Sequence, residues 1–344
     1  MGAIVSNLIL NEGIYTEQTY VRRPQDLHAS AFGKVAVLYG GRSSERAISL
    51  QSGENILNSL LQQGIDAHGV DVDENLANRL VDEKYDRVFI ALHGKEGEDG
   101  VVQGLIQMLG IPYTGSGVAA SALAMDKARA KLVMNGLNIP TPIFGVAKNL
   151  DVAHELAQKI GFPISIKPVA EGSSIGVTRV AKAQDIKLAF EKAAHYGDVI
   201  VEKWIDGKDF FVSILGNNVL PSVEVHTPGG FYDYQAKYES HETQYLCPAP
   251  ISEDQEQILR SLSYRAFCAL GCQGWGRVDL IRDHEGKFWV LEVNTIPGMT
   301  SHSLVPMSAK AAGLSFDEVV LSILASTLSV DQFSKIVGEV AQQA

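Results

Sequence analysis

Polar side chains in the last third of the sequence are spaced so that a β-hairpin would bring four of them onto one face. Two runs of alternating apolar and polar residues flank the dipeptide at 285–286, a pattern that predicts a hairpin. A hairpin symmetric about this turn places Asp279 opposite Glu292 and Arg277 opposite Asn294. Side chains two positions apart on a strand point the same way, so all four are expected to share a face.

Such a face predicts a divalent metal site. The carboxylates of Asp279 and Glu292 would repel each other unless a cation lay between them. Together with the amide oxygen of Asn294 they form a set of hard oxygen ligands, which suits Mg²⁺ that also binds substrate phosphates. A solvated hairpin face with an Arg–Glu ion pair is the alternative, but apolar residues such as Val278 and Val293 crowd the hairpin.

Phosphates at such a metal also need positive charge from the protein. The sequence contains no Walker A motif, so this charge must come from scattered lysines. Candidates are Lys127 at an expected helix start, Lys167 at an expected strand end, and Lys203, although each lysine taken alone is more typical of a surface position. The glycine-rich loop 172–176 is a candidate for contributing backbone amides.

A parallel sheet is expected to position the first groups of the site. The apolar run 35–39 precedes Gly40-Gly41, and strand patterns at 66–70 and 87–92 alternate with helical periodicity. Strands that alternate with helices are typical of a doubly wound α/β sheet. Ligands bind such sheets at the carboxyl ends of the strands, where Gly40-Gly41 and His93-Gly94 fall.

Two α+β modules are expected after about residue 125. Strand and helix patterns between 161 and 204 predict the first module, and the second begins near Gly207 and contains the hairpin. The polar, aromatic segment 226–250 carries four tyrosines. It is longer than an ordinary connection inside a domain, which indicates a functional loop.

Length, composition and charge exclude several classes of protein. A chain of 344 residues has room for two or three domains, and 46% apolar with 20% charged residues is ordinary for a globular protein. The 29 basic and 40 acidic residues give a net charge of −11, which argues against nucleic acid or an anionic membrane as a partner. No apolar run approaches the roughly 18 residues of a membrane-spanning helix.

Three smaller features have simple interpretations. The chain has 3 cysteines, which fits a reducing compartment, and Cys268 and Cys272 are expected to be buried thiols rather than metal ligands. The turn 115–120 is similar to a dinucleotide fingerprint, but the acidic residue expected about 20 positions later is missing, so NAD binding is not expected. Residues 1–32 lack the features of a signal peptide and are expected to form a loosely ordered extension or a short docked element.

The motifs taken together resemble those of one family. From about Lys34 to the C-terminal helix the chain is similar to D-alanine–D-alanine ligases of the ATP-grasp superfamily. The motifs that carry this resemblance lie at 38–46, 91–94, 98–100, 113–117, 125–127, 167–168, 171–174, 232–238, 274–279 and 292–304.

The resemblance implies a mixed α/β and α+β fold of the ATP-grasp kind, with an N-terminal doubly wound parallel-sheet domain followed by two α+β domains that clasp ATP. The expected division is an extension at 1–32, an N-terminal domain at 33–124, a central subdomain at 125–206 and a C-terminal subdomain at 207–338, in which the loop 226–250 is a lid.

The implied reaction is the ATP-dependent ligation of two D-alanine molecules to D-alanyl-D-alanine, for peptidoglycan precursor synthesis in the cytoplasm. It passes through a D-alanyl phosphate and releases ADP and phosphate. ATP and two Mg²⁺ ions are the implied cofactors, with Mn²⁺ able to substitute, and a homodimer is the family expectation.

The resemblance also implies roles for residues around the nucleotide. Asp279, Glu292 and Asn294 would bind the two metal ions, in agreement with the hairpin argument. Lys127 and Lys167 would hold phosphates. The remaining nucleotide ligands would be Lys237 at the γ-phosphate, Glu202, Lys203 and the backbone near Trp204 at the adenine, and Asp209 at the ribose, where glutamate is the residue expected in close relatives.

A second group of implied roles concerns the amino acids. Glu45 would pair with the ammonium group of the first D-alanine, and Arg277 and the Gly298 amide would stabilise the oxyanion of the tetrahedral intermediate. The other implied contacts are Ser303 and the Leu304 amide at the second carboxylate, a proton path through Tyr238, Ser173 and Glu45, and positive charge near the acyl group from His93, which is alternatively a structural histidine.

The sequence leaves two alternatives to this activity. Another ATP-grasp ligase with a different second substrate, such as D-lactate, is the first, although Lys237-Tyr238 favours D-alanine because relatives that make D-alanyl-D-lactate depart from this pattern. A nucleotide-binding module without catalysis is the second, and it predicts the loss of a metal ligand, whereas all three are present.

Overall fold

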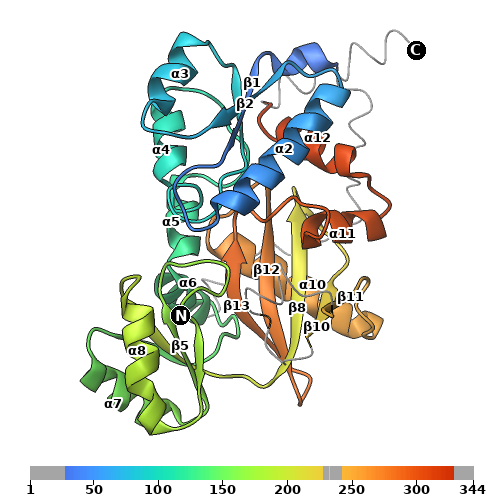
Figure 1. The fold of residues 1–344 in the computed structure, drawn as a ribbon. Helices are drawn as coiled ribbons and strands as arrows, with labels where there is room; N and C mark the ends of the chain where they lie inside the picture. Colours follow the sequence, from blue (N-terminus) through green and yellow to red (C-terminus); the bar gives the residue numbers. More distant parts are fainter. Residues whose placement is uncertain (1–27, 228–231, 233–241, 329–344) are drawn as a thin grey trace.

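The computed structural model describes residues 28–227, 232 and 242–328. Its first layer is a parallel three-stranded sheet of order β2-β1-β3, shown at the top of Figure 1, which confirms the α/β start of the fold. Apolar side chains of these strands and of the flanking helices are fully buried together. The elements are β1 (Val35–Tyr39), α2 (Arg46–Gln62), β2 (Ala67–Asp71), α3 (Leu76–Asp82), β3 (Arg87–Ile90) and α4 (Val101–Met108).

An antiparallel sheet of order β4-β7-β5-β6 forms the second layer, at the lower left of Figure 1. Helices α7 and α8 cover one of its faces, where Ile164 and Ile166 are buried. The opposite face carries the side chains that alternate with these, including Ser165 and Lys167. The elements are β4 (Phe144–Ala147), α7 (Leu150–Ile160), β5 (Ile164–Pro168), β6 (Thr178–Val180), η4 (Ala183–Asp185), α8 (Ile186–Ala194) and β7 (Val199–Lys203).

The central sheet of Figure 1 has the order β11-β10-β8-β12-β13, with β9 paired to β8. One face packs on helices α5, α6 and α10 in a single apolar core. The elements are α5 (Val118–Met125), α6 (Lys127–Gly136), β8 (Gly207–Leu215), β9 (Asn218–Val219), β10 (Val223–His226), β11 (Gln244–Leu246), α10 (Glu253–Ala269), β12 (Trp275–Asp283), β13 (Phe288–Asn294), α11 (Leu304–Ala311) and α12 (Phe316–Ala325).

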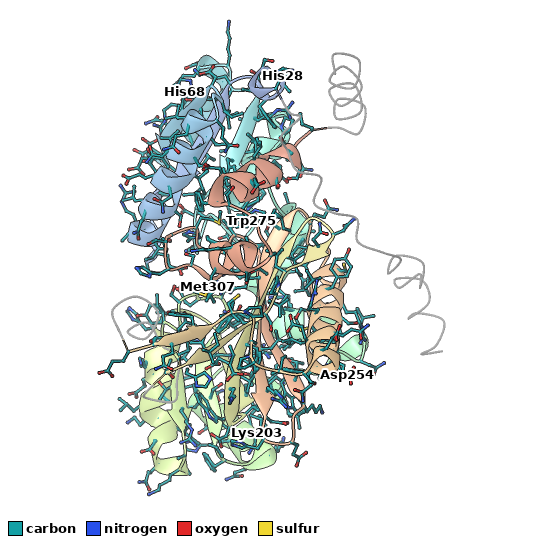
Figure 2. The ribbon with its side chains drawn as sticks, turned by 90° about the vertical axis from the view of Figure 1, so that its right-hand side faces the viewer. His28, His68, Lys203, Asp254, Trp275 and Met307 are labelled. Carbon is teal, nitrogen blue, oxygen red and sulfur yellow. The ribbon has the colours of Figure 1, made fainter. Side chains whose placement is uncertain are left out.

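The last sheet is joined to the first by packing rather than by strand pairing. Trp275 is buried in the same apolar core as β1 and β3, and its ring centroid lies 6.4 Å from that of Phe89. It lies in the middle of the molecule, between the two sheets (Figure 2). Helix α12 packs on α2, so the chain returns to its first layer. The domain boundaries at 124 and 206 remain a prediction.

Packed structure begins a few residues before Lys34. Residues Ala29–Phe32 form a short 3₁₀ helix, η3, whose Phe32 is fully buried in the first core. The buried Arg87 joins this segment to the C-terminal side, because its guanidinium donates to the carbonyls of Phe32 at 3.0 Å and Thr327 at 2.8 Å. The rest of the predicted extension, residues 1–27, lies outside the described residues.

The predicted hairpin is formed, and its register at the polar face is confirmed. Arg277 pairs with Asn294 and Asp279 with Glu292. The turn is longer than predicted, since three residues, 284–286, separate the hydrogen-bonded positions 283 and 287. A β-bulge in β13 leaves Leu291 without a paired residue on β12. The bulge shifts the pairing by one position and so restores the predicted register at Asp279 and Glu292.

No helix among the described residues is long and apolar enough to span a membrane.

Candidate functional site

Two adjoining cavities lie where the layers meet. The nucleotide cavity, as we call it, measures ≈ 350 Å³ and lies between the inner face of the second sheet and strands β8, β12 and β13. The substrate cavity measures ≈ 500 Å³ and lies between the first-layer loops, β12 and the start of α11. Glu292 and Tyr232 line both, so the two cavities meet at the polar face of the hairpin. Both volumes are in the range of small-molecule sites.

The predicted nucleotide ligands that the structure describes all line the first cavity. They are Lys127, Lys167, Glu202, Lys203, Trp204, Asp209, Asp279 and Glu292. Lys237 lies outside the described residues. The walls include apolar side chains such as Val177, Leu291 and Phe211, which can enclose a flat base. Leu291 is the bulge residue of β13, so the bulge helps to place both it and Glu292 beside this cavity.

Glu202 is held on the cavity wall by two lysines. Its carboxylate lies 3.2 Å from the Lys167 ammonium and 2.8 Å from that of Lys131. Burial opposes the charge of Glu202, but the two lysines outweigh it and lower the pKa of this carboxyl. Lys131 also donates to the Thr141 hydroxyl at 2.6 Å, and burial lowers its own pKa to about 8. Glu202 is therefore a fixed anion beside the cavity.

The backbone after β7 offers one amide to a ligand, that of Ile205, next to Trp204. The Trp204 amide donates to the Pro163 carbonyl at 3.1 Å, and its indole N–H donates to Asp206 at 2.9 Å. The Ile205 amide donates to no acceptor within the described part of the chain, and Ile205 lines the nucleotide cavity. The segment near Trp204 thus remains a candidate for the adenine through Ile205.

The predicted metal ligands come together at the junction of the cavities. Asp279 is bound by the Arg277 guanidinium at 2.6 and 2.8 Å, and Glu292 lies 3.1 Å from the Lys127 ammonium. Asn294 lines the substrate cavity, and its amide oxygen accepts from the Ile296 amide at 3.1 Å. Both carboxylates are therefore held in place by cationic side chains.

The donor chemistry of this set fits Mg²⁺. Two carboxylates and an amide oxygen are hard ligands, and phosphates and water would complete the coordination. No cluster of three His, Cys, Asp or Glu side chains able to hold a metal occurs in residues 28–227, 232 and 242–328. The set therefore resembles a site that shares its metal with a phosphate ligand rather than a protein-only metal cage.

The two cysteines four positions apart are not paired with each other. Cys272 is buried and Cys268 partly buried, both as free thiols.

The substrate cavity is lined by every described residue that was assigned to the amino acids. These are Glu45, His93, Ser173, Arg277, Gly298, Ser303 and Leu304. Tyr238, the remaining member of the predicted proton path, lies outside the described residues. The other two members of that path are in contact, since the Ser173 hydroxyl donates to the Glu45 carboxylate.

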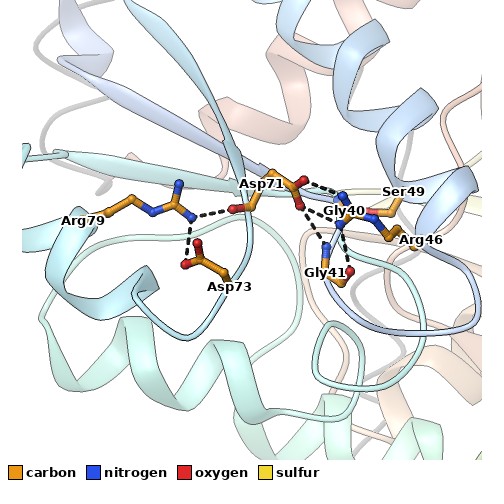
Figure 3. Close-up of polar contacts among 7 residues, drawn as sticks. All are labelled: Gly40, Gly41, Arg46, Ser49, Asp71, Asp73 and Arg79. Atoms are coloured by element: carbon orange, nitrogen blue, oxygen red, sulfur yellow. Dashed lines mark hydrogen bonds and ion pairs between the residues drawn. The ribbon is translucent and has the colours of Figure 1, made fainter.

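Glu45 is positioned by the loop between β1 and α2, whose contacts with Asp71 are drawn in Figure 3. Arg46 forms an ion pair with Asp71 at 2.6 Å and donates to the Gly41 carbonyl at 2.9 Å. Gly40 has a positive φ of 75°, and a Cβ there would collide with the Asp71 carboxylate, so this tight turn needs glycine. The loop is thereby tied to β2, and Glu45 lies at the N-cap of α2.

His93 is held by a chain of hydrogen bonds. Its Nδ1 lies 2.9 Å from the Ile296 carbonyl, which can only accept, so Nδ1 carries the proton. Its Nε2 lies 3.1 Å from the Ser52 hydroxyl, which also accepts from the Met299 amide at 3.1 Å. Burial lowers the pKa of His93. These contacts favour a structural role for His93, in which an uncharged imidazole fixes the segment 296–299. They do not favour a role as a source of positive charge.

The start of α11 faces the substrate cavity. Ser303 is the N-cap of this helix, and its hydroxyl lies 2.9 Å from both the amide and the hydroxyl of Thr300. Leu304 is the first helical residue, so its amide has no acceptor within the helix and can bind a carboxylate. A Cβ on Gly298 would lie 3.0 Å from the Ser303 hydroxyl, so glycine keeps this backbone close to the cavity.

Sequence reasoning missed two buried charged residues. Lys131 is fully buried behind Glu202, and Glu98 lines the substrate cavity beside Glu45. One Glu98 oxygen accepts from the Gly94 amide at 2.9 Å, and the other has no hydrogen-bond partner among the described residues. Burial, together with the charge of Glu45, raises the pKa of Glu98 to about 8. The sequence signal for Glu98 was the family motif at 98–100, but that motif implied no role for the Glu98 carboxyl group.

Known proteins match the chain over most of its length. A family model described as D-ala D-ala ligase C-terminus matches residues 143–325, and one described as D-ala D-ala ligase N-terminus matches residues 73–116. D-alanine–D-alanine ligase B of Pseudomonas syringae pv. tomato is 51% identical over 88% of this chain and 95% of its own. D-alanine–D-alanine ligase of Pseudomonas putida (strain GB-1) is 49% identical over 90% of this chain and 98% of its own.

Solved structures agree with these relatives. VanG D-Ala:D-Ser ligase from Enterococcus faecalis is 31% identical with a TM-score of 0.74, covering 86% of this chain and 99% of the other. D-alanine–D-alanine ligase from Bacillus anthracis in complex with ATP is 30% identical with a TM-score of 0.72, covering 89% and 98%. The fold is that of the ATP-grasp ligases, and the chain belongs to the D-alanine–D-alanine ligase family.

Proposed function

We propose that the protein joins two D-alanine molecules with ATP to give D-alanyl-D-alanine, ADP and phosphate. The observation that carries the proposal is the junction of the two cavities at Glu292, next to Asp279 and Arg277. A nucleotide in one cavity and an amino acid in the other would bring a γ-phosphate and a carboxylate together there. The family relatives bear the name of this reaction, and one is described in complex with ATP.

The nucleotide cavity is assigned to ATP. Apolar walls would enclose the base, Glu202 and the Ile205 amide would bind its edge, and Asp209 would bind the ribose. Lys127 and Lys167 would hold the phosphates, with Lys237 as a further ligand. Two Mg²⁺ ions, or Mn²⁺ in their place, would be held by Asp279, Glu292 and Asn294. When bound, these ions would neutralise charge that develops on the phosphates.

The first step is phosphoryl transfer to a D-alanine carboxylate. Glu45 would bind the ammonium group of this D-alanine, with its own position fixed by Ser173. A carboxylate oxygen then attacks the γ-phosphorus, the bond to ADP breaks, and an acyl phosphate forms. Burial would lower the pKa of Arg277, but Asp279 outweighs it and raises the pKa, so Arg277 remains a cation beside the reacting carboxyl.

The second step forms the peptide bond. The amine of a second D-alanine attacks the acyl carbon, and phosphate leaves with the original carboxylate oxygen. Arg277 and the Gly298 amide would stabilise the oxyanion, and Ser303 with the Leu304 amide would hold the second carboxylate. The amine must lose a proton first, for which Ser173 and Glu45 provide the described part of a path towards Tyr238.

Several wider properties belong to the same proposal. The dipeptide would serve peptidoglycan precursor synthesis in the cytoplasm, where ATP is available and free thiols such as the three in this chain persist. A homodimer is the proposed assembly, and neither nucleic acid nor a membrane is a proposed partner. The second substrate is the open choice, since one structural relative is described as a D-Ala:D-Ser ligase.

Product analysis tests the activity and its second substrate together. The protein is incubated near neutral pH with Mg-ATP and D-alanine, alone or with equal D-lactate or D-serine, and ADP and ligation products are measured. D-alanyl-D-alanine is expected to dominate in each mixture. Preferential formation of D-alanyl-D-lactate or D-alanyl-D-serine would overturn the choice of second substrate, and no ADP release with D-alanine would overturn the activity.

A further inference from the structure

The wall of the nucleotide cavity contains a buried serine hydroxyl that forms no hydrogen bond with any described residue. Ser165 lies in the middle of β5, which has a neighbouring strand on each side. Its side chain is on the face that lines the cavity, opposite Ile164 and Ile166 in the core. Ser165 is only 5% exposed, and its hydroxyl has no hydrogen-bond partner in the part of the chain that the structure describes. Such a buried polar group costs stability unless a ligand or water satisfies it.

The surroundings of this hydroxyl are those of a base-binding surface. Ser165 is paired across the strands with Glu202, whose carboxylate is fixed by the two buried lysines. A hydroxyl can donate and accept, whereas the ionised carboxylate only accepts. The same cavity also has apolar walls, which include Val177, Phe211 and Leu291, so a ligand with a flat body and a polar edge of donors and acceptors would suit it.

We propose that the Ser165 hydroxyl hydrogen-bonds the purine base of the nucleotide, at the edge that carries N7 and the 6-amino group. N7 is an acceptor for the hydroxyl proton and the amino group a donor for its oxygen, so either atom completes the contact. This inference rests on the proposed ATP site and adds to it a specificity-determining residue. It makes Ser165 unfavourable for the stability of the empty protein and favourable for nucleotide binding.

Calorimetric binding of Mg-ATP in the absence of D-alanine tests the contact. Ser165→Ala should weaken binding by about 3- to 10-fold, the effect of one neutral hydrogen bond. The melting temperature of the empty variant should be equal to or above that of the native protein, because the variant no longer buries an unpaired hydroxyl. The loss should shrink with 7-deaza-ATP or with purine riboside triphosphate, which lack N7 and the 6-amino group respectively.

Ser322→Ala is the matched control. Ser322 lies on α12, far from the nucleotide cavity in sequence and absent from its lining, and its hydroxyl is likewise buried without a described partner. This variant should bind Mg-ATP as the native protein does. Native affinity in Ser165→Ala, or an equal loss with ATP and both analogues, would overturn the inference. Failure of the native protein to bind Mg-ATP would instead refute the proposed function.

Discussion

Replacing Glu98 with glutamine should stabilise the protein at neutral pH and change its stability little near pH 5. Glu98 is buried beside Glu45, and its pKa is raised from 4.5 to about 8, first by burial and then by the charge of Glu45. Folding therefore takes up a proton at this carboxyl whenever the pH lies between these values. Glutamine resembles the protonated side chain, and its oxygen can still accept from the Gly94 amide.

The size of the effect follows from the shift in pKa. The native protein loses about 1.4 kcal/mol of stability per pH unit through this group as the pH rises between 4.5 and about 8. Below pH 4.5 both states are protonated, and the contribution disappears. The stability gain of Glu98→Gln should therefore grow by roughly 2–3 kcal/mol from pH 5 to pH 7.

Urea unfolding at a series of pH values measures this gain, because titrating groups distant from Glu98 affect native protein and variant alike. Glu155→Gln is the control, since Glu155 is exposed on α7 and its carboxylate is in water in both states. This control measures the effect of losing a carboxylate that is not buried. A gain for Glu98→Gln that is the same at pH 5 and pH 7 would refute the reasoning, because it would mean that Glu98 is charged in the folded protein.

Three further predictions concern the site and its scaffold. Arg277→Ala should lower kcat for ADP release by about two to three decades if this guanidinium stabilises the oxyanion, and an unchanged kcat would remove it from the mechanism. Asp71→Asn weakens the ion pair that ties the loop of Glu45 to β2 (Figure 3), so KM should rise several-fold for D-alanine and less for ATP, whereas equal changes would argue against a positioning role. Gly53→Ala puts a Cβ 2.5 Å from Tyr39 Cγ, where α2 packs on β1. Urea unfolding should show a loss of stability of about 1–3 kcal/mol, and native stability would contradict this prediction.

The hairpin shows what was predictable from sequence and why. Alternation along a strand is a local property, so the shared face of Arg277, Asp279, Glu292 and Asn294 followed from residue types and spacing. The length of the turn and the position of the bulge could not be predicted from this pattern. A three-residue turn shifts the ladder by one position, and the bulge at Leu291 shifts it back, so two local irregularities cancel at the polar face.

The missed residues depend on contacts between distant parts of the chain. In the sequence, Lys131 has the pattern of an ordinary helical lysine. It is buried against Glu202 only because α6 packs between two sheets. Glu98 is separated from Glu45 by more than fifty residues, so their proximity is a property of the fold. The role of the Ile205 amide also depends on tertiary structure: it has no acceptor among the described residues, whereas the Trp204 amide donates to the Pro163 carbonyl.

The transfer of oxygen from D-alanine to phosphate tests the central claim most directly. The protein is incubated with Mg-ATP and D-alanine labelled with ¹⁸O in both carboxylate oxygens, and the released phosphate is analysed by mass spectrometry. Attack by the carboxylate on the γ-phosphorus predicts one ¹⁸O in the phosphate for each dipeptide formed, together with ADP. Dipeptide formation with unlabelled phosphate, or with AMP and pyrophosphate as products, would contradict an acyl phosphate formed where the two cavities meet.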